Sequence, residues 1–280
     1  MSLRSLLFVP GDRPDRFAKA AASGADAIIL DLEDAVAAGR KAEARAAVAE
    51  YLSSAPPVPC FVRFNPLASP HAREDVALVA RRPAGIVLPK VEGPDDIRAW
   101  LGLIGDDAPP LLPLASETPA AVFTLGTYRP VAAHLAGMTW GAEDLTSAMG
   151  AQPRTADGSL TGTCLLARAL TVLGAHAAGV QAIETVFPAI DDLEALARYV
   201  ADARRDGFSG MMALHPAQVP IINAGFTPSA EDAAQAQRIV DAFAAHPGAG
   251  VLKVDGKMLD APHLKQALVT LERYAQYAAD

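Results

Sequence analysis

Cysteines are scarce in this sequence, with only Cys60 and Cys164 among 280 residues. They form no metal-binding or redox spacing and lie among apolar or small residues, so we expect buried structural thiols. No apolar segment reaches the ~18 residues that a membrane-spanning helix needs. The apolar run within Met1–Pro10 is too short for a secretion signal and lacks a small-residue cleavage site. These absences predict a cytoplasmic protein that does not enter a membrane.

Basic residues are also few. The sequence has 24 Lys and Arg against 32 Asp and Glu, which gives a formal net charge of −8. No basic patch is apparent, so we expect no nucleic-acid partner. An acidic protein can still bind an anionic ligand where its few cations converge. Apolar residues make up 51% of the chain, which excludes a disordered protein and permits a large core.

Short apolar runs alternate with amphipathic stretches, and this alternation predicts parallel βαβ units. Eight units in roughly 215 residues are typical of a closed (β/α)₈ TIM barrel, an α/β fold. A doubly wound open sheet is the alternative, and the lack of Gly-x-Gly-x-x-Gly after the first strand weakens its dinucleotide-binding form. The predicted strands are Ser5–Val9, Ala27–Leu32, Cys60–Phe64, Gly85–Leu88, Leu111–Leu114, Met138–Trp140, Ile183–Phe187 and Met211–Leu214. The clearest predicted helices are Arg13–Ser23, Lys41–Ser53, Pro94–Ile104, Thr163–Ala178 and Asp192–Asp206.

The pattern changes after Asn223, in a tail that has no place among the eight units. We expect a barrel domain over residues 1–225 and a C-terminal helical extension over residues 226–280. Within the extension we predict, in order, a long helix, a loop, a further segment and a final helix: Ser229–Ala245, His246–Gly250, Val251–Asp260 and Pro262–Ala279.

Polar residues follow nearly every predicted strand. In a parallel barrel these positions reach the carboxyl-terminal mouth, where catalysis takes place. Any one of them is as readily a solvated loop residue, but their recurrence indicates a charged site at one mouth. The positions are Asp31, Glu33, Asp34, Arg63, Asn65, Lys90, Glu92, Glu117, Glu143, Asp144, Glu184 and His215.

Glu117 and Asp144 form the strongest pair, because 27 positions, about one αβ unit, separate them. Adjacent strands should therefore carry them. Two carboxylates without His or Cys beside them suit Mg²⁺, which prefers oxygen ligands and keeps sites for water and substrate. The alternative is a pair of solvated acids or helix N-caps.

Arg63 should emerge from a buried strand, where a guanidinium can hold a carboxylate and stabilise an oxyanion. The alternative is a structural ion pair with the acidic cluster Asp31–Asp34. Lys90 is a candidate Schiff-base lysine, although the predicted metal pair disfavours that chemistry. His215 is as readily structural as catalytic, and Trp140 belongs to the core or the mouth.

Several motifs, in this order and spacing, resemble the citrate lyase β / malyl-CoA lyase / HpcH–HpaI aldolase superfamily from about Ser5 to His263. They are Phe8-Val9-Pro10-Gly11-Asp12-Arg13-Pro14-Asp15-Arg16-Phe17, Asp31-Leu32-Glu33-Asp34-Ala35-Val36, Arg63-Phe64-Asn65, Leu88-Pro89-Lys90, Glu117-Thr118, Gly141-Ala142-Glu143-Asp144-Leu145 and Leu214-His215-Pro216.

The resemblance implies that Glu117 and Asp144 hold Mg²⁺ and that Arg63 binds the substrate carboxylate or carbonyl. The tail motif Asp255–His263 resembles the acyl-CoA branch, in which the aspartate matching Asp260 is a catalytic acid/base from a neighbouring subunit. Free-acid aldolases of the superfamily lack this tail, so coenzyme A is the expected carrier in the substrate. Pro119-Ala120-Ala121-Val122 and Phe123–Arg129 depart from the usual pattern, which leaves the exact substrate open.

The function implied is retro-Claisen cleavage of a 3-hydroxyacyl-CoA, of the citryl, malyl or citramalyl type, to acetyl-CoA and a 2-oxo acid. Gly141 and Ala142 are expected at the substrate carboxylate, together with Arg63 and the metal pair. The nucleotide phosphates of coenzyme A are assigned to Arg13, Arg16 and Lys19, although Arg16 and Lys19 are equally readily plain surface charges. Alternatives are a metal-dependent aldolase on free 2-oxo acids, a thioesterase or malate-synthase-like enzyme, and the β subunit of a citrate lyase complex.

The tail also predicts assembly. Its motif carries Met258 and Leu259, with Leu264 beside it, whereas an unpartnered extension would more often be polar and loosely ordered. We therefore expect a homo-oligomer, a trimer or hexamer, in which each tail packs on a neighbouring subunit and places Asp260 over its mouth. The alternative is a tail that covers its own barrel.

Overall fold

The computed structural model describes residues 3–277. The chain divides into two compact units, one ending at Asn223 and the other starting at Ala224. None of the helices within residues 3–277 combines the length and the apolar character that crossing a bilayer requires. Both cysteines are buried and unpaired, as predicted, and burial raises the pKa of the Cys60 thiol to about 12. That thiol is therefore no nucleophile at neutral pH.

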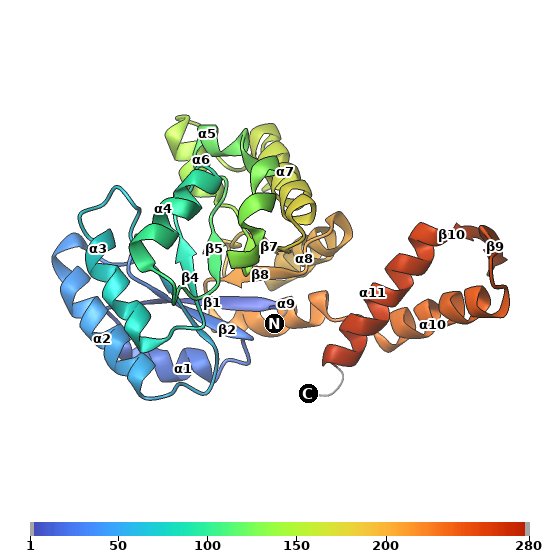
Figure 1. Cartoon of the computed structure of the whole chain (residues 1–280), viewed down its shortest axis with the longest axis horizontal. Coiled ribbons are helices and arrows are strands. Elements are labelled where there is room, and N and C mark those ends of the chain that lie inside the picture. Colours follow the sequence, from blue (N-terminus) through green and yellow to red (C-terminus); the bar gives the residue numbers. More distant parts are fainter. Residues whose placement is uncertain (1–2, 278–280) are drawn as a thin grey trace. The chain divides into compact units, whose positions relative to one another are not determined.

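Eight parallel strands form the core of the first unit (Figure 1). Their order, β5-β4-β3-β2-β1-β8-β7-β6, brings the first strand beside the last. Parallel bridges from Leu111 to Leu135 and from Leu114 to Thr139 join β5 to the β6 side, so the sheet closes on itself. The predicted (β/α)₈ barrel is confirmed. The strands are β1 Ser5–Pro10, β2 Ala27–Asp31, β3 Cys60–Arg63, β4 Gly85–Leu88, β5 Leu111–Pro113, β6 Gly137–Met138, β7 Gln181–Glu184 and β8 Gly210–Ala213.

Helices flank the strands of this unit (Figure 1). Two, α2 and α4, have the predicted bounds, and the Asp192 side chain caps α8 by accepting from the Ala195 N–H. The first predicted helix is shorter than expected, because Pro14–Arg16 is a separate 3₁₀ turn. The helices are α1 Phe17–Ala21, α2 Lys41–Ser53, α3 Ala72–Asp75, α4 Pro94–Ile104, α5 Pro119–Val122, α6 Ala142–Ala148, α7 Gly162–Ala178, α8 Leu193–Asp206 and α9 Val219–Phe226, which crosses the unit boundary.

Alternation along the strands decides which side chains reach the mouth. Successive strand residues point to opposite faces, so residues two apart share a face. On β2, Ala27 and Ile29 belong to the buried cluster inside the barrel, and Asp31 continues the same row. On β3, Phe61 lies in that cluster, and Arg63 is the next inward position. Asp31 and Arg63 also pair in register across the two strands.

The second unit is an α-helical hairpin with a small β-hairpin between its helices. Helix α10 (Ala230–Ala245), capped by Ser229, packs on α11 (Ala261–Tyr277), and strands β9 (Val251–Val254) and β10 (Lys257–Asp260) pair antiparallel. Asp255 and Gly256 both have positive φ, 50° and 80°, as the tight turn of a two-residue hairpin requires. The geometry of this turn therefore explains two residues of the tail motif, Asp255 and Gly256. Residues 278 and 279 of the predicted last helix lie outside the described residues.

Candidate active site

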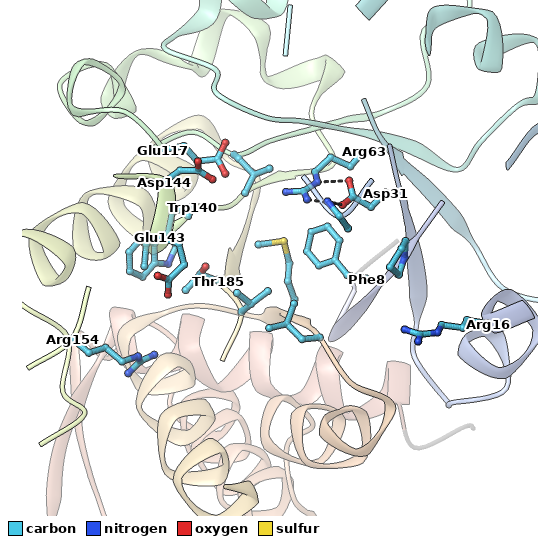
Figure 2. A pocket seen from close by; sticks show the side chains of 18 residues that line it. Phe8, Arg16, Asp31, Arg63, Glu117, Trp140, Glu143, Asp144, Arg154 and Thr185 are labelled. Carbon is cyan, nitrogen blue, oxygen red and sulfur yellow. Dashed lines mark hydrogen bonds and ion pairs between the residues drawn. The ribbon is translucent and has the colours of Figure 1, made fainter. Parts of the chain in front are cut away.

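A cavity of about 320 Å³ opens at the carboxyl-terminal mouth of the barrel (Figure 2). Side chains at or just after the ends of β1, β2, β3, β5, β6, β7 and β8 line it. This is where a parallel barrel carries its active site. The cavity collects several of the predicted site residues: Arg16, Arg63, Glu117, Gly141, Ala142 and Asp144.

Glu117 and Asp144 lie next to each other on one side of this cavity (Figure 2). Glu117 is buried and accepts a hydrogen bond of 2.7 Å from the Lys90 backbone N–H, whereas Asp144, in the first turn of α6, is half-buried. Burial, together with the charges of Asp144 and Glu33, raises the pKa of Glu117 to about 8, although the Lys90 N–H and the charge of Arg63 lower it. The charged form of Glu117 is therefore disfavoured unless a cation joins it and Asp144.

Gly141 makes room for the Glu117 carboxylate. A Cβ atom at this position would stand 2.8 Å from Glu117 Oε1, closer than real Cβ contacts allow. Within residues 3–277 no group of three or more His, Cys, Asp and Glu side chains is placed to bind a metal. The chain can thus supply two carboxylates, and water and substrate would complete an octahedral oxygen shell. This set fits Mg²⁺ and does not fit Zn²⁺.

Arg63 is held by the acidic cluster and still lines the cavity. Its Nε and Nη2 donate to the two oxygens of Asp31, each at 2.7 Å, and Nη1 lies 3.1 Å from Glu33 Oε2. The guanidinium also stacks over the Phe8 ring, with its central carbon 4.8 Å from the ring centre. The ion pair given as the alternative therefore exists, and it fixes the planar fork with N–H groups of Nη1 and Nη2 left for a ligand.

Lys90 is unsuited to Schiff-base chemistry. Its Nζ lies 2.5 Å from Glu33 Oε1 and 3.7 Å from Asp144 Oδ1. Burial alone would lower its pKa, but the hydrogen bond and charge of Glu33, with Asp144 and Asp34, raise the pKa above the usual lysine value. A Schiff-base lysine needs a free amine, whereas this one stays protonated. Its backbone, at a φ of 54°, instead presents the N–H that Glu117 accepts.

The residues assigned to coenzyme A are only partly brought together. Arg16 lines the cavity, on the opposite side from Arg154 in Figure 2. Arg13 is paired with Asp15 at 2.9 Å, and Lys19 is exposed on α1; neither lines the cavity. Asp260 belongs to the second unit, where its Oδ1 lies 2.6 Å from His263 Nδ1. Its catalytic role stays a prediction.

Seven of the twelve predicted polar positions do not line the cavity: Glu33, Asp34, Asn65, Lys90, Glu92, Glu184 and His215. The exposed His215 caps the turn Pro216–Gln218, where its Nδ1 accepts from the Ala217 N–H at 3.2 Å. Glu184 is fully buried on the outer side of the barrel, while Thr185, one residue later, lines the cavity. Strand alternation is the signal that identifies this difference, because Ile183 points inward and Glu184 must then point outward.

Sequence reasoning missed the network around Glu184. Its Oε1 accepts from Trp140 Nε1 at 2.5 Å and from the Thr185 N–H at 2.8 Å, and both donors line the cavity. Its Oε2 accepts from Arg168 Nε at 2.5 Å, and Arg168 also pairs with Asp206. A buried ion pair on α7 and β7 therefore supports one wall of the cavity from behind.

Glu184→Ala should lower the free energy of unfolding by about 3–5 kcal/mol, because it leaves the Arg168 charge and the Trp140 N–H buried without this partner. Urea denaturation followed by circular dichroism measures the change. The matched control is Glu194→Ala, which removes an exposed ion pair with Arg198 on α8 and should change little. Equal effects of the two substitutions would contradict a supporting role for the buried pair.

Residues 4–216 match the family described as HpcH/HpaI aldolase/citrate lyase. A citrate lyase subunit beta-like protein of Deinococcus radiodurans is 35% identical over 282 residues, covering 98% of each chain. A (3S)-malyl-CoA thioesterase of Cereibacter sphaeroides is 36% identical, over 99% of this chain and 96% of its own length.

A solved structure has the same fold over nearly the whole chain. The protein CitE of Mycobacterium tuberculosis, in complex with magnesium, acetoacetate and coenzyme A, is 32% identical in sequence and has a TM-score of 0.83. The match covers 98% of each chain. The comparison therefore includes the tail as well as the barrel, and the resemblance seen in the motifs is confirmed.

Proposed function

The chain belongs to the HpcH/HpaI aldolase/citrate lyase family, and on that premise we propose that it is a Mg²⁺-dependent carbon–carbon lyase. Its substrate is a 3-hydroxyacyl-CoA thioester, which it cleaves to acetyl-CoA and a 2-oxo acid. The observation that carries this proposal is the Glu117–Asp144 carboxylate pair, which faces the same cavity as Arg63. The magnesium and coenzyme A bound by the related CitE support it.

Glu117 and Asp144 would hold the metal. When bound, Mg²⁺ would act as a Lewis acid on the substrate hydroxyl and the adjacent carboxylate. The chain prepares the position by burying Glu117, by aiming the Lys90 backbone N–H at its second oxygen, and by omitting a side chain at Gly141. Because these groups are fixed before the ligand arrives, little reorganisation is needed on binding.

Arg63 would stabilise the negative charge that develops as the carbon–carbon bond breaks. Asp31 and Phe8 fix its guanidinium, so the remaining N–H groups point in set directions. In the cleavage, the hydroxyl gives its proton to water and its oxygen becomes the carbonyl of the 2-oxo acid. The bonding pair passes to the departing thioester enolate, and an acid then protonates the methylene carbon. We assign that last proton to Asp260.

A panel of citryl-, malyl- and citramalyl-CoA, incubated with Mg²⁺, tests the proposal. The lyase reaction releases acetyl-CoA and a 2-oxo acid in equal amounts, and both can be followed by chromatography. Cleavage of none of the three thioesters, with Mg²⁺ present, would refute the proposed function.

Hydrolysis of the thioester is the second candidate function, because a (3S)-malyl-CoA thioesterase is 36% identical over nearly the full chain. In that reaction water takes the acyl group, and free coenzyme A appears without acetyl-CoA. The same panel separates the two reactions, since only the thioesterase raises the thiol concentration.

Arg63→Lys should lower kcat about a hundredfold, because lysine keeps the charge but loses the planar fork that pairs with Asp31 and faces the cavity. Steady-state kinetics on the best thioester of the panel provide the measurement. Arg98→Lys, on the exposed face of α4, is the control and should leave kcat unchanged. A lysine variant with near wild-type kcat would make Arg63 a purely structural residue.

A further inference from the structure

Arg154 is a cation of the cavity that the proposed mechanism does not use. It belongs to the loop between α6 and α7, where its backbone forms an isolated antiparallel β-bridge with Leu160. Its side chain lines the cavity together with Arg16 and Arg63. Arg63 is already engaged by Asp31 and Glu33, and Arg16 is assigned to the nucleotide phosphates. The role of the third arginine is therefore open.

The charge of Arg154 has no carboxylate partner within residues 3–277. The hydrogen bond from its Nη1 to the Gly158 carbonyl, at 2.8 Å, is its one hydrogen bond in this part of the chain. The guanidinium carbon lies 5.2 Å from the ring centre of Phe187 and 5.6 Å from that of Tyr199. Aromatic rings hold a cation in place without neutralising it. The loop therefore presents a fixed positive charge with several N–H groups free for an acceptor.

The place of Arg154 relative to the other groups indicates what it would bind. Figure 2 shows Arg154 and Arg16 on opposite sides of the cavity, with the carboxylate pair and Arg63 near a third side. A thioester whose coenzyme A arm enters beside Arg16 would have its hydroxyl carbon at the metal pair. The substituent on that carbon would then be directed toward Arg154.

We propose that Arg154 determines substrate specificity by binding a second carboxylate on the acyl group, carried by the substituent of the hydroxyl carbon. This inference rests on the proposed function and narrows it to acyl groups of the citryl type, in which that substituent is a carboxymethyl group. In the citramalyl group it is a methyl, and in the malyl group a hydrogen, so neither gives the arginine an acceptor.

The negative charge of Glu143 would weaken the binding of a carboxylate at Arg154. Its side chain also lines the cavity, and Figure 2 places it near Trp140 and Thr185. A carboxylate at Arg154 would feel the repulsion of Glu143 as well as the attraction of the guanidinium. Glu143→Gln should therefore strengthen the preference for the citryl thioester, in the opposite direction from Arg154→Gln.

The test compares citryl-CoA with citramalyl-CoA, which differ by this carboxylate alone. Arg154→Gln should lower kcat/KM for citryl-CoA roughly tenfold to a hundredfold, the effect of one lost charge-assisted hydrogen bond, and change citramalyl-CoA less than about threefold. Arg154→Lys should restore part of the loss. Arg198→Gln, in a neighbouring cavity but not in this one, is the control and should alter neither substrate.

Binding without turnover gives an independent readout. Calorimetric titration of both thioesters in EDTA should show weaker binding of citryl-CoA to Arg154→Gln and unchanged binding of citramalyl-CoA. If Arg154→Gln loses affinity for citryl-CoA alone while the wild type cleaves neither thioester with Mg²⁺, the lyase proposal fails and the role of Arg154 stands. Equal losses for both thioesters, or no loss for either, would overturn the role of Arg154 and leave the lyase proposal intact.

Discussion

Glu117→Gln is expected to abolish Mg²⁺-dependent turnover, with a loss of roughly a thousandfold or more. Among residues 3–277, two carboxylates are placed to hold the metal, and glutamine removes the charge of the buried one while keeping its size. The amide oxygen can still accept from the Lys90 backbone N–H, so the local fold should persist. Burial opposes the charged form of Glu117, and metal-free protein should therefore lose no stability on this substitution.

Calorimetric titration with Mg²⁺, followed by assay over a range of Mg²⁺ concentrations, measures both parts of this expectation. Glu92→Gln is a matched control, since Glu92 accepts from Thr118 beside the site but does not line the cavity. It should bind Mg²⁺ and turn over like the wild type. Unchanged Mg²⁺ affinity together with unchanged turnover in Glu117→Gln would remove Glu117 from the metal site.

The barrel could be predicted because its signals are local and repeated. Eight apolar runs separated by amphipathic stretches determine eight βα units, and each predicted strand overlaps an observed one. The spacing of Glu117 and Asp144 likewise follows from the length of one unit. Alternation within a strand is just as local, and it separates the inward Asp31 and Arg63 from the outward Glu184.

The remaining features depend on contacts between distant segments. Arg154 lies in an irregular loop, and its guanidinium packs against Phe187 and Tyr199 from two later segments. No periodic pattern in the sequence therefore predicts its position. The ion pair between Arg168 and Glu184 also joins a helix to the next strand. In the tail, the sequence pattern predicts Val251–Asp260 as one segment, whereas the structure divides it into two antiparallel strands at the Asp255-Gly256 turn.

The shared-site hypothesis for Asp260 predicts a result that no single variant can give. Asp260→Asn should be inactive, because the amide cannot exchange the proton with the methylene carbon. It should fold normally, since asparagine can still hydrogen-bond His263. Glu117→Gln is inactive for a different reason, in the barrel. If each tail serves a neighbouring barrel, a mixed oligomer contains some sites that combine an intact barrel with an intact tail.

Random assembly from equal amounts of the two variants sets the size of the recovery. A site is complete when its barrel comes from the Asp260→Asn chain and its tail from the Glu117→Gln chain. Each choice has an even chance in a closed ring with one donor for each barrel, so about a quarter of wild-type activity should return. A tail that serves its own barrel would give no recovery, because every chain then carries one defect at its own site.

The control mixes Glu117→Gln with Asp144→Asn, two defects of the same mouth. Every barrel in that mixture lacks one metal ligand, so reassembly cannot restore any site, whichever subunit supplies the tail. Both mixtures are denatured and refolded together, and formation of mixed oligomers is verified with two different affinity tags. Recovery in the first mixture and none in the second would assign Asp260 to the neighbouring subunit's site. Mixed oligomers that stay inactive in both mixtures, or an active monomeric wild type, would contradict the shared site. The tail would then serve its own barrel or have a purely structural role.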